Sequence, residues 1–134
     1  MLRDFSEVVG WLDRQPRSSL WTTSVTVFEI QFGLNLMTAG KKQVTLAPDM
    51  EFFLDRIERR IAPFDEAAAR RAGELMASLQ KSGTPRDVRD TMIAGIVLAH
   101  RASLATRNAH HFSDIAATVI NPWSTESLLT GVVF

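Results

Sequence analysis

The stretch that decides the fold is Asp90–Asn121, DTMIAGIVLAHRASLATRNAHHFSDIAATVIN. It predicts a helix that begins with an acid, a strand that ends in Thr106–Asn108, a turn and a final strand. Residues at i, i+3, i+4 and i+7 of a helix lie on one face, so Asp90 shares its face with three apolar residues. Those three residues are Ile93, Ala94 and Val97. A carboxylate therefore stands on the stripe that is expected to face the core.

A carboxylate that faces the core costs free energy unless something compensates it, and a bound cation is one compensation. A second acid, Glu29, occurs in the same kind of position. The sequence predicts a helix from about Val25 to Ala39, with Ser24 as its N-cap and Gly40 at its end. Glu29 lies in the middle of the expected apolar stripe, which consists of Val25, Phe28, Phe32 and Leu36.

The remaining elements alternate between short apolar strands and longer helices. Asp87 is expected to cap the helix that contains Asp90. The other expected helices are 5–15, 41–60 with a break at Pro48, and 66–80, and the expected strands are 20–23, 61–64, 104–106 and 119–120. This alternation predicts an α/β fold with a parallel sheet, whose working site lies at the carboxyl ends of the strands.

Composition excludes several classes of protein. The chain has 134 residues, 46% of them apolar and 22% charged, which is typical of one globular domain with a real core. The formal net charge of zero argues against a general nucleic-acid binder. The absence of cysteine excludes disulfides and thiolate chemistry and fits a reducing cytoplasm. No apolar run reaches the roughly 18 residues of a membrane span, and acids interrupt the N-terminal segment, so we expect neither a span nor a signal peptide.

Six segments carry a resemblance to a known family. They are WLDRQP (Trp11–Pro16), TTSVTVFEIQFGL (Thr22–Leu34), PFDEAAA (Pro63–Ala69), DTMIAGI (Asp90–Ile96), LATRN (Leu104–Asn108) and VINPW (Val119–Trp123). In this order and at this spacing they resemble PIN-domain proteins, specifically the VapC-type toxin ribonucleases that are also called plasmid stability proteins. The resemblance implies a parallel sheet flanked by helices. It also implies acids that bind Mg²⁺ or Mn²⁺ and cut single-stranded RNA, in a homodimer inhibited by a cognate antitoxin.

The resemblance assigns roles to individual residues. Glu29 and Asp90 match the second and third acids of the family and would be metal ligands and catalytic residues. Asn108 occupies a position where relatives have Asp or Asn, and would be a neutral ligand or orient a water. Thr106 matches a small polar residue beside the site, and Arg107 would contact a phosphate of the substrate.

The N-terminus departs from the family pattern. Relatives begin with a central strand and an Asp-Thr-Asn motif that supplies the first acid, whereas here only Asp4 stands nearby. We therefore expect a truncated PIN-like domain over residues 1–123 that lacks the first central strand, followed by a tail over 124–134. An inactive truncated homologue that only binds an antitoxin or dimerises is the alternative function.

Each candidate residue also has a structural interpretation. Glu29 would point to solvent or pair with an arginine, and Asp90 would only help to cap its helix. Asn108 would be a turn residue and Arg107 a surface cation. The adjacent His110 and His111 suggest a metal site, but neighbouring residues point to different sides, which favours a surface turn. A set of phenylalanines would belong to the core or to a partner surface, namely Phe28, Phe32, Phe52 and Phe53.

Overall fold

The strands of the chain form one parallel sheet. The computed structural model describes residues 13–14, 19–37, 41–106, 108–121 and 132–133. Within these ranges the sheet has the strand order β2-β1-β5-β3-β4, and every pair of neighbours is parallel. The strands are β1 (Leu20–Thr23), β2 (Ile61–Ala62), β3 (Ser103–Ala105), β4 (Val119–Ile120) and β5 (Val132–Val133). The predicted α/β fold is confirmed.

The central place in the sheet belongs to β5. Val132 is in register with Leu20 of β1 on one side and with Ser103 of β3 on the other. The sequence predicted a sheet that lacks its first central strand, and β5 occupies the place between β1 and β3. It comes from the segment that we expected to be a tail, whereas residues 1–12 lie outside the described part of the chain.

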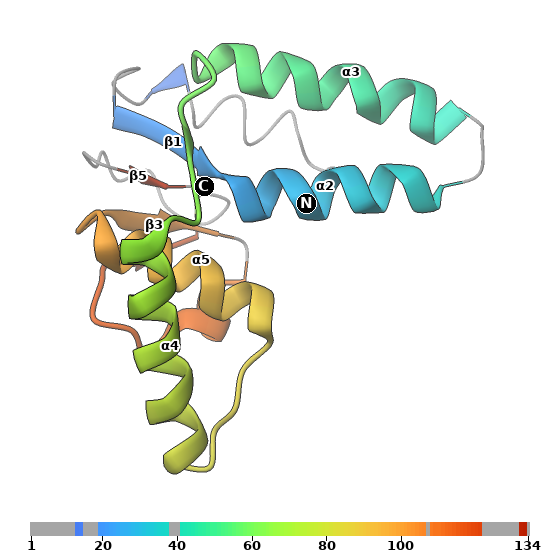
Figure 1. The fold of residues 1–134 in the computed structure, drawn as a ribbon. Coiled ribbons are helices and arrows are strands. Elements are labelled where there is room, and N and C mark those ends of the chain that lie inside the picture. The colour runs from blue at the N-terminus through green and yellow to red at the C-terminus, as the bar shows by residue number, and fades with distance from the viewer. Residues whose placement is uncertain (1–12, 15–18, 38–40, 107, 122–131, 134) are drawn as a thin grey trace.

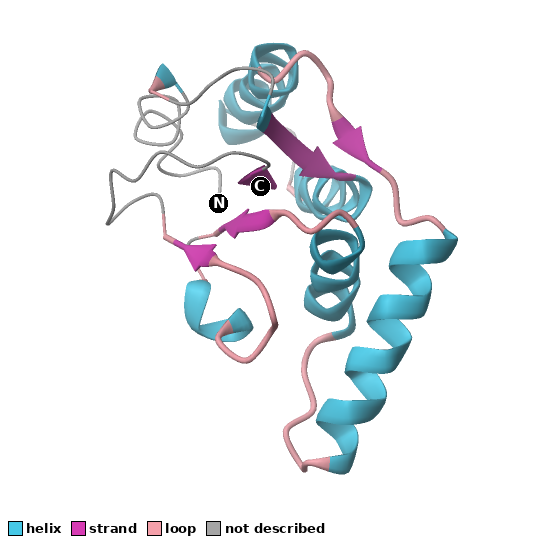
Figure 2. Cartoon of the chain, turned by 90° about the vertical axis from the view of Figure 1, so that its left-hand side faces the viewer, coloured by secondary structure: helices cyan, strands magenta, loops and turns pink. Residues whose placement is uncertain are grey.

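Four α-helices and one 3₁₀ helix accompany the strands in the described part of the chain. They are α2 (Ser24–Leu36), α3 (Lys41–Arg56), α4 (Glu66–Lys81), α5 (Val88–Ala99) and η3 (Ala109–Phe112). In Figure 1, α2 and α3 run side by side at one end of the molecule, and α4 and α5 lie at the other. The long helix at the lower right of Figure 2 is α4, which follows β2. None of the described helices is both long and apolar enough to cross a bilayer.

Two hydrophobic clusters lie against the sheet. Leu104 and Ala105 are consecutive residues of β3 and belong to different clusters, because successive side chains of a strand point to opposite faces. The cluster with Ala105 includes residues of α2 and α3, such as Leu34, Met50 and Leu54. The cluster with Leu104 includes residues of α4, α5 and η3, such as Ala68, Val97 and Phe112.

The closest approach between helices joins α4 and α5. A Cβ built on Gly95 of α5 would lie 2.5 Å from the backbone oxygen of Ala68 and 2.8 Å from the Cβ of Ala72. Gly95 is therefore required by the packing of the helices. This contact fixes α5, whose first turn contains Asp90.

The predicted core face of α2 is wrong. Of the expected stripe only Val25 is buried, and Phe28, Phe32 and Leu36 are exposed. The helix contacts the core instead through Ile30 and Leu34, which join the cluster with α3. Since α2 has apolar residues on both sides, its periodicity does not determine which side faces the sheet.

Two details of the helix ends and interiors also differ from prediction. The N-cap of α2 is Thr23, whose Oγ1 accepts a hydrogen bond of 2.9 Å from the N–H of Thr26. Ser24, the predicted cap, accepts a bond of 3.0 Å from the N–H of Phe64 instead.

The helix α3 continues through Pro48, where we predicted a break. A proline removes a single backbone donor, and a helix of this length keeps its other bonds. Gly40, the predicted end of α2, lies outside the described residues.

Candidate metal centre

The candidate site lies at the carboxyl ends of the strands, as the α/β fold predicts. The helix α2, which contains Glu29, begins directly after β1, and Thr106 and Asn108 follow directly after β3. Asp90 lies in the first turn of α5, where Asp87 caps the helix as predicted. The carboxylate of Asp87 accepts hydrogen bonds from the N–H groups of Arg89 at 2.8 Å and Asp90 at 3.4 Å.

Glu29 and Asp90 are two partly desolvated carboxylates, and the charge of Asp90 acts on Glu29. Burial raises the pKa of Glu29, the charge of Arg89 lowers it, and the charges of Asp90 and Asp87 raise it further. Burial also raises the pKa of Asp90, together with the charge of Asp87, while His111 and the nearby arginines lower it. The fold therefore brings together two acids from helices more than 50 residues apart, and it holds them where their charged forms are disfavoured.

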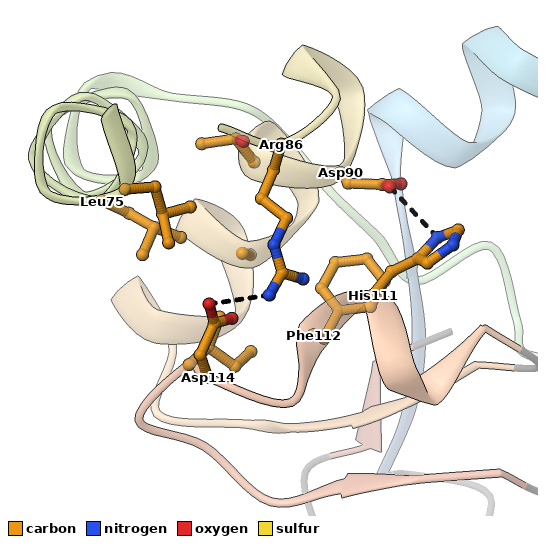
Figure 3. Close-up of a pocket in the computed structure, with 10 residues that line it drawn as sticks. Leu75, Arg86, Asp90, His111, Phe112 and Asp114 are labelled. Atoms are coloured by element: carbon orange, nitrogen blue, oxygen red, sulfur yellow. Dashed lines mark ion pairs between the residues drawn. The ribbon is translucent and has the colours of Figure 1, made fainter. Parts of the chain in front are cut away.

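His111 reaches Asp90 from the other side of the site. Its Nδ1 atom lies 3.5 Å from Oδ2 of Asp90, as the dashed line in Figure 3 shows. Both side chains are partly exposed, 45% for His111 and 26% for Asp90. The sequence predicted a surface turn for His110 and His111, and η3 is indeed an exposed turn, but the contact with Asp90 was not foreseen.

The turn that contains His111 is anchored to the protein. Phe112 is buried in the cluster with Leu104 and Val97, and the backbone N–H of His111 donates a hydrogen bond of 2.9 Å to the oxygen of Asn108. Just beyond the turn, Asp114 forms an ion pair of 2.7 Å with Arg86, next to the small pocket drawn in Figure 3. Arg86 precedes α5, so this ion pair joins the two segments that present Asp90 and His111.

The other predicted site residues are less closely connected. Asn108 is exposed at the N-cap of η3, and its N–H donates a hydrogen bond of 3.2 Å to Oγ1 of Thr106. Thr106 is half-buried, and its own N–H pairs with the oxygen of Ile120 in β4. Within the described ranges, no hydrogen bond or ion pair joins the Asn108 side chain to Glu29 or Asp90. Arg107 lies outside the described residues.

The donor set fits a hard divalent cation held by few protein ligands. Among the described residues no group of three or more His, Cys, Asp or Glu side chains is close enough to surround a metal ion. Magnesium, however, is usually held by one or two carboxylates together with water and substrate phosphate. Two desolvated acids, one of which raises the pKa of the other, are the kind of pair that a cation would neutralise.

The fold and the order of the acids define a known class of protein. The PIN-domain family model matches residues 3–117, and the chain belongs to this family. Two similar curated proteins are the VapC ribonuclease Y4jK of Sinorhizobium fredii and the plasmid stability protein StbB of Pseudomonas syringae pv. tomato. They are 35% and 33% identical to the chain; the alignments cover 87% and 88% of it, and 84% and 86% of the relatives.

A toxin and its complex are similar as well. Toxin FitB of Neisseria gonorrhoeae is 31% identical over 87% of this chain and 84% of its own length. The solved structure of FitAB bound to the IR36 DNA fragment matches with a TM-score of 0.78 and 30% identity, covering 93% of this chain and 88% of that one. The predicted resemblance to VapC-type proteins is thus confirmed.

Proposed function

We propose that this protein is the toxin of a toxin–antitoxin, or plasmid stability, system and acts as a metal-dependent endoribonuclease. The observation that carries the proposal is the convergence of Glu29 and Asp90, two half-buried acids with raised pKa values, at the carboxyl ends of the strands. The ribonuclease and toxin names of relatives that align over most of the chain support it.

Glu29 and Asp90 would hold one Mg²⁺ or Mn²⁺ ion. When bound, such an ion lowers the pKa of a coordinated water and stabilises the leaving oxygen of a phosphodiester. Asn108, at the edge of the site, would orient a water or contribute its amide oxygen. Thr106 and Arg107 would contact the RNA backbone, which brings its own phosphate oxygens to the ion.

The partners follow from the relatives. The solved neighbour FitAB is a complex that includes a protein similar to this chain, and we propose that a cognate antitoxin binds and inhibits this protein. We propose in addition that the protein forms a homodimer and acts in the cytoplasm, where its RNA substrate is found.

The test is cleavage of a single-stranded RNA by the purified chain with Mg²⁺, with Mn²⁺ and with EDTA. We expect cleavage that needs the cation and is lost in Glu29→Gln and Asp90→Asn. Glu74→Gln is the matched control, because Glu74 is an exposed carboxylate of α4 that pairs with Arg71 of the same helix. Cleavage that persists in EDTA, or in both acid variants, would overturn the proposal.

A second candidate is a homologue that binds an antitoxin without cutting RNA. One observation favours it: the described residues do not provide a third close ligand. A wild-type chain that forms a stable complex with an antitoxin but has no cation-dependent cleavage would establish this alternative.

A further inference from the structure

We infer that this protein dimerises through α2 and α3. A ridge of exposed apolar side chains on α2 of one copy packs into the groove between α2 and α3 of a second copy, and the second copy does the same in return. The ridge consists of Phe28, Phe32 and Leu36. The inference rests on the homodimer included in the proposed function, and it names the surface that joins the two copies.

The ridge is a continuous apolar row along α2. Its residues are spaced by four, which places them on one face of the helix. Phe28, Phe32 and Leu36 are 59%, 51% and 69% exposed, and the two phenylalanine rings are parallel, with centroids 6.3 Å apart. Because a whole aromatic side chain covers about 150–250 Å², the row presents roughly 300 Å² of apolar surface. Exposed patches of this size often mark an interaction site.

A groove of matching character lies between α2 and α3. It encloses about 450 Å³, and its apolar lining comes from Leu34, Ala47, Pro48 and Met50. Sites that accept a bound group usually measure about 300–1,000 Å³. The groove is therefore large enough for side chains of the ridge.

The ridge and the groove are neighbours on the surface. A helix turns about 100° per residue, so Gln31 and Asn35, which line the groove, lie on one side of the ridge, and Glu29 lies on the other. A two-fold axis can then place each ridge over the groove of the partner, as an isologous interface requires. In Figure 1, α2 and α3 extend side by side away from the sheet, so two such pairs can pack as a four-helix bundle. Glu29 stays at the edge of this interface.

The distribution of charge favours a second copy over a charged partner. Of the residues that line the groove in the described part of the chain, only Glu51 is charged, and it forms an ion pair with Arg59. Two copies therefore meet without repulsion between like charges. The exposed positions of α2 carry no charge at all: Phe28, Gln31, Phe32, Asn35 and Leu36.

The area also suits a homodimer. A stable interface buries about 800 Å² on each partner, and homodimer interfaces are about 65% apolar. The ridge supplies less than half of that area. The apolar lining of the groove and its polar edge supply the remainder, because in an isologous contact each copy contributes both surfaces.

The experiment measures the mass of the purified full chain by sedimentation equilibrium over a range of concentrations, without added metal. We expect Phe32→Glu, which brings an acid to the groove that Glu51 of the other copy lines, to weaken the dimer by about 30-fold or more, as at an interface hot spot. Pro48→Glu, on the groove side, should weaken it as well. Phe52→Glu is the matched control, because Phe52 is 52% exposed but belongs to α3 and does not line the groove.

Four results would overturn the inference. A wild-type chain that stays monomeric up to about 100 μM would leave the ridge to another partner. A dimer that Phe32→Glu leaves intact would exclude the ridge, and one that Pro48→Glu leaves intact would exclude the groove. Equal weakening by Phe52→Glu would place the contact elsewhere on α3. Circular dichroism shows which variants are folded, and Pro48→Glu keeps the test valid if Phe32→Glu is not.

RNA cleavage is measured separately on the same wild-type sample. A dimeric chain that does not cleave RNA would refute the proposed ribonuclease and leave the interface standing. A monomeric chain that cleaves RNA would refute the interface alone.

Discussion

Oδ2 of Asp90 and Nδ1 of His111 lie 3.5 Å apart, although Asp90 is in the first turn of α5 and His111 is in η3, which follows β3. The contact can form only if α5 and β3 run antiparallel, so that the start of the helix and the end of the strand lie at the same edge. The geometry of the candidate site therefore depends on the direction of the strands in the sheet.

The first prediction concerns stability and activity together. Asp90→Asn and Glu29→Gln should each raise the melting temperature of the metal-free protein at about pH 7, because each replaces an acid whose charged form the fold disfavours. Both variants should lower RNA cleavage by more than about 100-fold, as expected for loss of a metal ligand. Calorimetry measures the melting temperature and a cleavage assay measures the activity. A lower melting temperature in both variants would contradict the predicted gain in stability.

The second prediction is a pH dependence. Burial raises the pKa of Glu29 above 4.5 and that of Asp90 above 3.8 in the folded protein. A raised pKa means that the folded state binds protons more readily than the unfolded state, so the stabilisation is complete below the ordinary pKa and is lost as pH rises through the folded value. Relative to the double variant Glu29→Gln, Asp90→Asn, the metal-free wild type should gain stability as pH falls from about 7 towards these values.

The charges around these two acids set the controls for that measurement. Asp87, Arg89, Arg86 and His111 all act on Asp90 or Glu29. They are present in both proteins, so the difference between wild type and double variant isolates the two acids. Urea unfolding across the pH range measures this difference. If the double variant exceeds the wild type in unfolding free energy by more at low pH than at pH 7, the predicted direction of the pH dependence is wrong.

The third prediction concerns the cap of α2. Thr23 is fully buried, and its Oγ1 accepts from the N–H of Thr26 and lies 2.9 Å from the Thr26 hydroxyl. Thr23→Ala should cost about 1 kcal/mol of unfolding free energy, the usual value for loss of an N-cap. Thr23→Ser keeps the hydroxyl and should cost less. Equal losses in chemical denaturation would mean that the methyl group, rather than the cap, stabilises this position.

The fourth prediction tests the contact of α4 with α5. Gly95→Ala should destabilise the protein by about 1–3 kcal/mol, because the new methyl group would overlap the backbone of α4 at Ala68 and Ala72. Gly73 is the matched control: it lies in α4, and a Cβ there would meet no described atom within 4 Å. Gly73→Ala should stabilise by about 0.5–1 kcal/mol through helix propensity. Denaturant melts of the two variants should shift in opposite directions.

The fifth prediction concerns β5. Val132 pairs with Leu20 and Ser103 on its two sides, so Val132→Pro should lower the melting temperature strongly, since proline cannot donate to a ladder in a central strand. Val132→Thr keeps the backbone donor and a β-branched side chain and should have a much smaller effect. Similar melting curves for wild type and the proline variant would show that β5 contributes little to the sheet.

Much of the fold was predictable because the strong signals were local. The alternation of strands and helices, the Asp87 cap and the buried face of α5 follow from periodicity and from residues close in sequence. The face of α2 was not predictable, because Phe28 and Phe32 on one side and Ile30 and Leu34 on the other are equally apolar, and the choice depends on α3. Nor was β5, whose two residues form a strand only because β1 and β3 lie on either side.

The site was predictable only in part, for a similar reason. Glu29 and Asp90 attracted attention as acids on apolar helices, a pattern that each helix shows by itself. The contact of His111 with Asp90 depends on where a turn lies after the fold has formed, and no local pattern contains that information. A histidine next to another histidine in an exposed turn has the same appearance in the sequence with or without such a contact.

The central position of β5 has a consequence for how the protein is made. β5 is synthesised after every other described strand, so the described sheet joins β1 to β3 only once its two residues have arrived. Until then, the edges of β1 and β3 that pair with β5 have no partner among the described strands. Such edges attract other strands, and pairings between distant parts of a chain form slowly. The nascent protein should accordingly depend on chaperones during translation more than a PIN domain whose central strand emerges first.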